Sequence, residues 1–438
     1  MRQSTKSFIK YVSLNMLGML GLSIYILADT LFIAQDLGEA GIAALNLSIP
    51  AFGVMQGIGL MLGLGGATRF RILLSQQNKE QAKRVYSQTL LFAILLSLVF
   101  VLLGLVASNQ LAWLSGADAE TFSNTAIYLR TILTFAPFFI LNSVLQSFVR
   151  NDGDPSLSMA AMVVGSLLNI LLDYVFMFLL GMGMFGAALA TSIAPIISIS
   201  ILSIHYFKPY NQLKLTLQAF QSRVLKDVMY LGSTAFINEV AAAFVIFTFN
   251  IIIFSLEGNA GLAAYGIIAN IGFVVLSLFT GIAQGTQPLL SESYGYNDLK
   301  QMKQVLKLSL LTSGLLSILV YTTTVLFTDE IISAFNTEQS EHVAQMAAIG
   351  LLIYFFGFFF AGMNTVLTTY FSATDQPRRA LFFSLLRGGI IILPLVVVLS
   401  RLFGMTGVWL SFVLTELIVL VIIVWRMNPN KRIKSRKL

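Results

Sequence analysis

The sequence predicts an all-α integral membrane protein of twelve transmembrane helices in two pseudo-symmetric six-helix bundles. Three observations lead to this prediction: 57% of the residues are hydrophobic and only 11% are charged, twelve long apolar runs follow one another, and similar residues recur about 220 positions apart. A soluble chain of 438 residues needs many more charged side chains to cover its surface. We therefore expect most of this surface to face lipid.

The first apolar run follows Arg2, Lys6 and Lys10 and is longer than the apolar region of a signal peptide. It also lacks an A-x-A cleavage site, so we interpret it as a retained helix. A bilayer core of about 30 Å is crossed by about 20 helical residues. The predicted helices cover residues 11–33, 41–68, 86–107, 124–149, 157–180, 184–206, 228–255, 261–284, 304–328, 343–370, 380–400 and 405–426.

Basic residues gather in alternate connections between these helices. Arg401 is the only basic residue in the connections of the other set, where Asp118, Glu120, Asp329 and Glu330 also lie. Because positively charged connections stay in the cytoplasm, both termini are predicted to be cytoplasmic. A net charge of +7 that is spread in this way indicates topology and not nucleic-acid binding.

The two halves of the chain resemble each other. Gly65, Lys83 and Val85 match Gly285, Lys303 and Val305 at one offset, and FVRNDGDP (148–155) resembles FSATDQP (371–377). Corresponding helices run in the same direction, which is typical of parallel repeats. We predict an N-terminal bundle over 1–207, a cytoplasmic linker over 208–227 and a C-terminal bundle with a basic tail over 228–438. The linker either lies flat on the membrane or forms a polar loop.

Few charged residues fall inside the predicted helices, and each needs an explanation because a charge at mid-bilayer costs roughly 2.5–3.5 kcal/mol. Asp29 lies in helix 1 and Asp173 in helix 5, with Asn169 one turn before Asp173. In helix 6, Ala187 and Thr191 are again one turn apart. Together these residues predict an oxygen-lined pocket for a proton or a hard monovalent cation such as Na⁺.

The second half lacks such a pair, since Asp173 corresponds there to Pro394. Glu239 in helix 7 has no acidic partner in helix 10, and it is either a counter-charge for the substrate or a structural hydrogen-bonding group. We expect Arg387 and Glu416 to form a structural pair between neighbouring helices. For the acids of the first half, the alternative is that each is only hydrogen-bonded between packed helices.

Other classes of function find little support. The chain has no cysteine, and His205 and His342 lie far apart without H-E-x-x-H around them, so no metal or thiol chemistry is indicated and we predict no enzyme and no cofactor. No G-x-x-x-x-G-K-[ST] loop is present for a primary pump. A flippase for a lipid-linked precursor remains an alternative, although only Arg130 and Arg387 are basic residues in the intramembrane parts of the predicted helices.

Several segments resemble the multidrug and toxic compound extrusion (MATE) transporters. They are ADTLFIAQDLGEAGIAALNLSIP, RNDGDPSLSMAAMVVGSLLNILLDYVFMF, GMGMFGAALATSIAP, AAYGIIANI and GIAQGTQPLLSESYGYND, in this order along the chain. The resemblance covers nearly the whole sequence. It is closer to the DinF- and MepA-like type than to the NorM-like type, which pairs an acid of helix 7 with one of helix 10.

The resemblance implies a secondary antiporter of the bacterial plasma membrane that exchanges H⁺ or Na⁺ for organic cations. The family's cation site corresponds to Asp29, Asn169, Asp173 and Thr191 with the backbone of Ala187. The implied partners are small organic cations and membrane lipid, with no nucleic acid, and the expected functional unit is a monomer. Helix 1 contains Gly18 and Gly21 but no proline, so bending at a proline on protonation is not expected.

Overall fold

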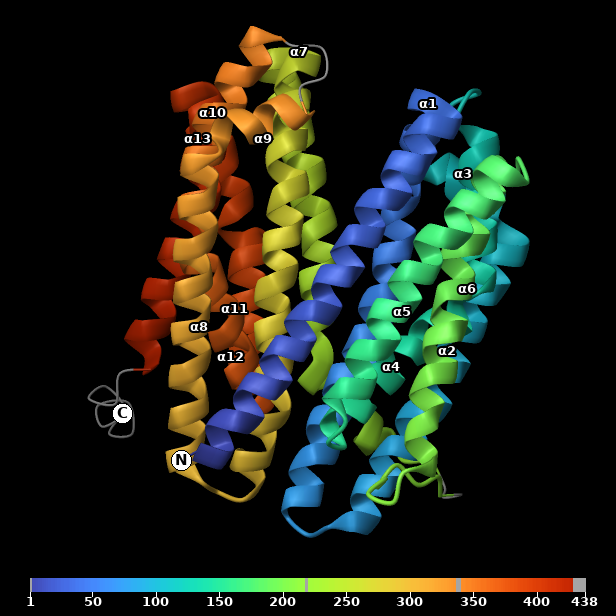
Figure 1. Cartoon of the computed structure of the whole chain (residues 1–438), viewed down its shortest axis with the longest axis vertical. Helices are drawn as coiled ribbons and strands as arrows, with labels where there is room; N and C mark the ends of the chain where they lie inside the picture. The colour runs from blue at the N-terminus through green and yellow to red at the C-terminus, as the bar shows by residue number, and fades with distance from the viewer. Residues whose placement is uncertain (1, 217–219, 336–339, 428–438) are drawn as a thin grey trace.

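The computed structural model describes residues 2–216, 220–335 and 340–427, with side chains from residue 4. These residues form helices joined by short connections, and they contain no β-strand (Figure 1). The predicted all-α fold is therefore confirmed. The elements are α1 (Arg2–Ser75), α2 (Lys79–Leu114), α3 (Phe122–Thr134), α4 (Ala136–Asn151), α5 (Pro155–Asp173), η1 (Tyr174–Leu179), α6 (Gly183–Ser203), η2 (Ile204–Phe207), α7 (Ser222–Gly295), α8 (Leu299–Leu326), α9 (Thr328–Phe335), α10 (Glu341–Phe356), α11 (Phe358–Ala373), α12 (Pro377–Leu385), η3 (Leu386–Ile390) and α13 (Ile392–Met427).

Three continuous helical stretches each cross the membrane twice: α1, α7, and α12 together with η3 and α13 (Pro377–Met427). α1 and α7 have 74 residues each, which at 1.5 Å per residue far exceeds a bilayer core of about 30 Å. Each turns back at one glycine with positive φ: Gly38 at 62°, Gly258 at 58° and, in α13, Gly404 at 58°. Only glycine adopts this conformation without strain. Up to nine apolar spans lie in the described residues, and these three turns divide them into twelve crossings.

Several helices extend beyond their predicted limits. The run predicted over 86–107 lies within α2, which begins at Lys79 and ends at Leu114. Hydropathy detects only the part in contact with lipid, whereas helical hydrogen bonding continues into the polar layers. The fourth predicted helix is bent by 52° between α3 and α4, because Pro137 has no N–H to continue the helical ladder.

The helix ends and connections that carry basic residues meet at one end of the molecule, here named the basic end. It contains the start of α1 and the connections 76–78, 152–154, 208–216, 220–221, 296–298 and 374–376 (Figure 1, bottom). Residues 211–216 are not helical, so this part of the predicted linker is a loop, and 217–219 lie outside the described residues. Of the basic tail, residues 428–438 also lie outside them.

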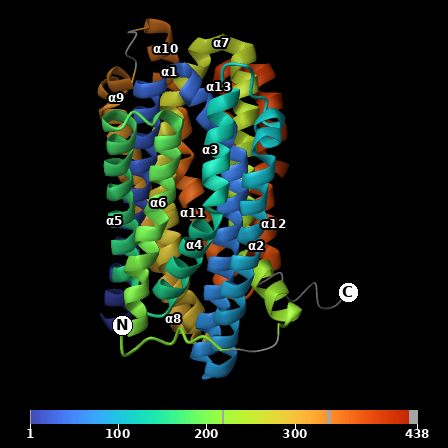
Figure 2. The same ribbon diagram turned by 90° about the vertical axis from the view of Figure 1, so that its right-hand side faces the viewer.

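The chain has two apolar cores, one in α1–α6 (the first bundle) and one in α7–α13 (the second bundle). The two bundles lie side by side in Figure 1, and in Figure 2 the first bundle stands in front of the second. The beginning of α1 belongs to the second core, because Phe8, Tyr11 and Val12 pack there. α1 therefore starts against the second bundle and continues into the first. Near the basic end the two bundles come into backbone contact, where Gly65 lies against the carbonyl of Val228 and Gly232 against that of Met61.

Ion pairs reinforce this contact at the basic end. Arg69 of α1 pairs with Asp227 of α7 at 2.8 Å and with Asp375 at 3.1 Å. Arg71 pairs with Glu292 of α7 at 2.8 Å. These bonds join the first bundle to the second, so the basic end is closed in this structure.

Buried amides add a second set of bonds across the same interface. Arg150 donates to Gln284 at 3.0 Å, Asn151 donates to Gln287 at 3.0 Å, and Gln287 donates to Thr68 at 2.7 Å. All of these residues except Gln284 are at least 97% buried. Buried polar groups need such partners, because leaving one unpaired costs about 1–3 kcal/mol. The interface therefore holds the bundles in a defined register.

The second bundle contains one paired charge cluster in its interior. Arg387 of η3 donates to both carboxylate oxygens of Glu416 at 3.0 and 2.9 Å. Asn364 of α11 donates to the same carboxylate at 2.6 Å and to the Glu416 carbonyl at 2.8 Å. The predicted pairing of Arg387 with Glu416 is confirmed. This cluster carries no net charge and needs no added ion.

Removing one member of this pair is expected to destabilise the protein. Arg387→Met leaves the Glu416 carboxylate buried without a counter-charge, and it should lower the free energy of unfolding by roughly 3 kcal/mol. Replacing both residues, by Arg387→Met with Glu416→Leu, should recover most of that loss. Thermal unfolding of the detergent-solubilised variants measures the difference. A double variant no more stable than Arg387→Met would contradict a structural pair.

The ion pairs at the basic end should determine how often that end opens. Arg69→Gln with Arg71→Gln removes the salt bridges across the interface, which are partly exposed and contribute about 1 kcal/mol or less each. We expect a several-fold larger population with separated bundles. The natural chain has no cysteine, so spin labels at Glu80→Cys and Lys300→Cys report the distance between bundles. Distance distributions that do not change would show that the amide bonds alone keep this end closed.

Candidate functional site

Two carboxylates are buried in the interior of the first bundle. Asp29 lies on α1 and is 6% exposed, and Asp173 ends α5 and is fully buried. The Oδ1 atom of each has no hydrogen-bond partner, and among the described residues no Lys or Arg forms an ion pair with either. The two acids interact electrostatically with each other. The sequence predicted them together, and the fold brings them together.

Asn169 and Thr191 complete the polar wall beside Asp173. The Asn169 amide has one terminal atom 3.1 Å from Asp173 Oδ2 and the other 3.2 Å from the backbone nitrogen of Thr191. The orientation that satisfies both groups directs its nitrogen to the carboxylate. Ala187 is buried one turn before Thr191 on α6, and its role as a backbone ligand stays a prediction.

Two tyrosines belong to the same site and escaped the sequence analysis. Tyr25 lies one turn before Asp29 on α1, and Tyr128 lies on α3. Each interacts electrostatically with both aspartates, and Tyr128 also hydrogen-bonds Thr191. The spacing of four residues between Tyr25 and Asp29 was a signal for the first tyrosine. Nothing in the sequence links Tyr128 to this site, because only the packing of α3 places it there.

The chemistry of this site is suited to binding a cation. Two ionised carboxylates in a medium of low dielectric constant repel each other, and neither has a basic partner to offset the cost of burial. A proton or a monovalent metal ion bound between Asp29 and Asp173 removes this repulsion. Carboxylate, amide and hydroxyl oxygens are also the ligands that a hard cation prefers. No group of three or more His, Cys, Asp and Glu suited to a metal occurs among the described residues.

A small cavity lies on the basic-end side of the aspartates. Its volume is about 70 Å³, and its wall includes polar side chains from five helix segments. These are Tyr25, Gln56, Asn142, Gln146, Ser166 and Ser198. Thr191 belongs both to this wall and to the aspartate site. The carboxylate site therefore adjoins a polar space inside the first bundle.

Glu239 is separate from this site and lies where the bundles meet. It is half-buried on α7, and its Cβ is 3.3 Å from where a Cβ on Gly57 of α1 would be. Nearby on α7, Ile237, Val240 and Phe244 line an apolar cavity of about 380 Å³ that η3 also borders. A carboxylate between the bundles is suitably placed to face a cation in the space between them.

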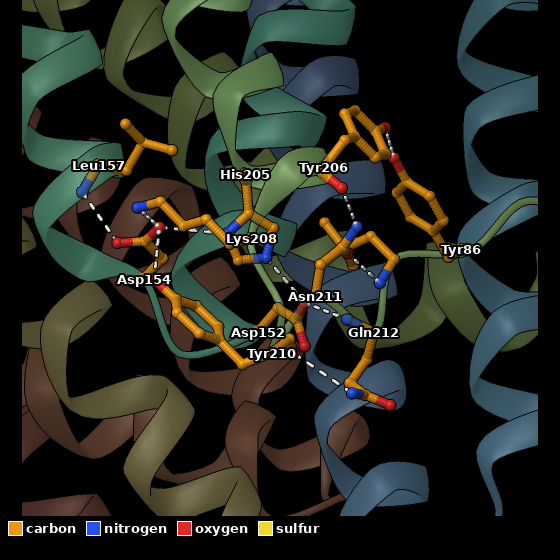
Figure 3. Close-up of polar contacts among 11 residues, drawn as sticks. Tyr86, Asp152, Asp154, Leu157, His205, Tyr206, Lys208, Tyr210, Asn211 and Gln212 are labelled. Atoms are coloured by element: carbon orange, nitrogen blue, oxygen red, sulfur yellow. Dashed lines mark hydrogen bonds and ion pairs between the residues drawn. The ribbon is translucent and has the colours of Figure 1, made fainter.

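A second cluster of ionisable groups lies at the basic end and was missed by the sequence analysis. His205 is fully buried, with Nε2 2.8 Å from Asp152 Oδ2 and Nδ1 3.1 Å from Asp154 Oδ2 (Figure 3). Lys208 donates to Asp154 at 2.5 Å, and the backbone N–H of Gln212 donates to Asp152 at 2.7 Å. The two aspartates of NDGDP (151–155) were a sequence signal for a charged cluster. Their partner His205, however, is about 50 residues further along the chain.

The electrostatics of this cluster favour the charged form of Asp154. Burial would raise the pKa of Asp154, but hydrogen bonds from Lys208 and His205 outweigh burial and lower the pKa below its ordinary value. Asp154 also caps α5 by accepting from the Leu157 N–H. The cluster thereby fastens the loop after α6 to the start of α5.

Comparisons with known proteins agree with this architecture. The chain is 28% identical over 403 residues to the multidrug export protein MepA of Staphylococcus aureus, an alignment that covers 92% of this chain and 88% of that protein. A solved outward-facing multidrug resistance MATE family transporter of the MOP superfamily has the same fold, with a TM-score of 0.91 and 22% identity over 99% of this chain and 97% of that one. A solved MOP superfamily transporter from Pyrococcus furiosus, described as having a binding pocket of reverse polarity, is also similar. Its TM-score is 0.90 at 21% identity, over 99% of this chain and 97% of that one.

The family model named MatE matches residues 15–175 and 235–398. These two stretches contain both aspartates, Asn169 and Glu239, and they correspond to the two halves of the internal repeat. The carboxylate pair and most of the crossings lie within this match, which spans most of the chain. The protein therefore belongs to the MatE family, the multidrug and toxic compound extrusion transporters that its sequence resembles.

Proposed function

We propose that this protein is a secondary active antiporter that exports organic, often cationic and lipophilic compounds in exchange for H⁺ or Na⁺. The observation that carries the proposal is the buried pair Asp29 and Asp173, which has no basic partner within the described residues. The names of its relatives, multidrug export proteins and transporters, support the same class of substrate. We place the protein in the bacterial plasma membrane as a monomer, with the basic end and both termini in the cytoplasm.

The proposed exchange follows from electrostatics. With the basic end closed, an ion that enters from outside neutralises Asp29 and Asp173. The site then attracts a cationic compound less strongly, and the compound leaves outward. Each monovalent ion that moves inward through 100 mV supplies about 2.3 kcal/mol, which supports a substantial gradient of the exported compound. Release of the ion to the cytoplasm restores the charged pair.

Neutralising either aspartate should uncouple transport. In proteoliposomes, Asp29→Asn or Asp173→Asn is expected to reduce efflux driven by an ion gradient at least tenfold, because the site then loses one of its two exchangeable charges. Efflux of a fluorescent organic cation measures the rate. Asp36→Asn is the matched control, since Asp36 lies on the same helix but is exposed. Wild-type rates in both site variants would show that this pair does not couple the ion.

The coupling ion is identified by imposing the two gradients separately. We expect a pH gradient or a sodium gradient alone to drive efflux of the fluorescent cation from the same vesicles. Efflux driven by the pH gradient should disappear when a protonophore is present, whereas efflux driven by the sodium gradient should persist. Efflux that responds to neither gradient, but requires ATP, would contradict a secondary transporter.

Glu239 should distinguish cationic from neutral substrates. Glu239→Gln removes a negative charge between the bundles and is expected to weaken the binding of a monocation roughly tenfold, or about 1.4 kcal/mol, while an uncharged substrate binds as before. Binding titrations on the purified protein measure both affinities. Glu257→Gln, on the same helix at an exposed position, serves as the control. Equal losses for both substrates would instead indicate that Glu239 has a structural role.

A further inference from the structure

Polar residues form a line on each of two neighbouring helices of the first bundle. On α6 and the short helix η2 that continues it, Thr191, Ser198 and His205 are spaced by seven residues, or nearly two turns each, so they lie along one side. All three are at least 94% buried. This line begins at the aspartate site, where Thr191 bonds Asn169, and it ends in the cluster at the basic end.

α5 carries the complementary line, and the two lines meet at three levels. At the first level, the Asn169 amide lies against Thr191. At the second, a Cβ on Gly165 would lie 3.5 Å from the Cβ of Ser198. At the third, Asp154 bonds His205 at 3.1 Å. The seam between α5 and α6 thus carries polar groups from the middle of the membrane to the basic end.

Gln146 of α4 connects the levels. Its Nε2 lies 3.4 Å from Ser198 Oγ and 3.4 Å from Asn142 Oδ1, and its backbone carbonyl accepts from Ser158 Oγ at 3.4 Å. Ser158 is one turn from Asp154 on α5. The cavity of about 70 Å³ beside Gln146 has room for several water molecules and polar groups to bind them.

At the basic end, His205 is surrounded by groups that accept and donate protons. Asp152 and Asp154 face its two ring nitrogens from the α4–α5 connection, and Lys208 and Tyr210 approach from the loop after α6 (Figure 3). Lys208 is 29% exposed, so the cluster reaches the aqueous phase. An imidazole can accept a proton at one ring nitrogen and release one from the other.

We propose that this seam is the route by which the coupling proton passes from Asp29 and Asp173 to the basic end. The proposal rests on the proposed antiport function and adds the ion and its path. One proton leaves the carboxyl group, which becomes a carboxylate, and moves along waters held by Gln146, Ser198 and Ser158. It is taken up by the cluster around His205, which releases one proton to the cytoplasm.

The seam favours a proton over a sodium ion. Met162 and Leu202 are buried between its polar levels, and apolar side chains offer no ligands to a metal ion. A proton needs only a hydrogen-bonded chain. The second bundle lacks this chain: at the offset that relates Gly183 to Gly404, the residues corresponding to Thr191, Ser198 and His205 are Phe412, Val419 and Arg426. The proposed path is thus a property of the first bundle alone.

Removing the middle of the path should slow proton delivery without removing the aspartate site. The test compares wild type with Ser198→Ala, Gln146→Leu and the double variant in liposomes that contain a pH-sensitive dye. We expect the variants to bind a fluorescent cation normally and to release it on acidification. Proton movement coupled to transport should fall at least tenfold in the double variant, and D₂O should slow it more than it slows wild type.

The controls separate this proposal from the antiport function. Ser200→Ala, an exposed hydroxyl on α6 that bonds Ile196, should behave as wild type. Asp29→Asn should lose the release on acidification that the path variants retain. If Ser198→Ala and the double variant keep wild-type proton rates and isotope effects while Asp29→Asn is uncoupled, the path is wrong and the antiport function stands. Transport driven by sodium without a change in luminal pH would also overturn the path.

Discussion

Burial of two acidic groups without a positive partner is the constraint on which the proposed function of this protein depends. Asp29 and Asp173 are almost fully buried in the interior of the first bundle, so charging both acids is costly. The second bundle solves the same problem differently, because Arg387 neutralises Glu416 there. A neutral cluster is indifferent to the ion gradient, whereas an uncompensated pair gains stability each time it binds a cation.

α1 connects the aspartate pair to the contact between the bundles. Its beginning, with Phe8, Tyr11 and Val12, is part of the core of the second bundle, and its continuation carries Tyr25 and Asp29 in the first. Any shift of α1 when the aspartates bind an ion must therefore act on packing in both bundles. The part of α1 before Gly38 contains no proline, so bending at a proline is not available to it.

Much of the architecture was predictable because lipid imposes simple rules. Hydropathy located the crossings, and the charge of the connections defined one end. The pattern Asn169, Asp173 and Thr191 was recognisable because its members are spaced by helical turns within one hairpin of helices. The limits of the helices were not predictable, since α2 continues beyond its apolar part at both ends. The turns at Gly38, Gly258 and Gly404 required backbone dihedral angles that composition does not reveal.

The parts that escaped prediction depend on packing between distant segments. His205 looked isolated in the sequence, yet the antiparallel packing of α5 and α6 brings it between Asp152 and Asp154. Tyr128 reaches Thr191 only because α3 packs beside α6. The first case follows a geometric rule, because in a pair of antiparallel helices residues near the start of one meet residues near the end of the other. In the second case α3 and α6 run in the same direction, and residues at similar depth meet.

The side chains on the helix faces explain how two similar halves have different chemistry. The repeat reproduces the scaffold, including positive-φ glycines at Gly38 and Gly258, but each line along a helix face can change independently of the backbone. In the first bundle the line on α6 and η2 is Thr191, Ser198 and His205, and in the second its counterpart is Phe412, Val419 and Arg426. The first bundle, which has a polar seam along its helices, therefore differs from the second bundle, which lacks one, by a few side chains. The two bundles therefore share a backbone fold and differ in the side chains on the faces of their helices.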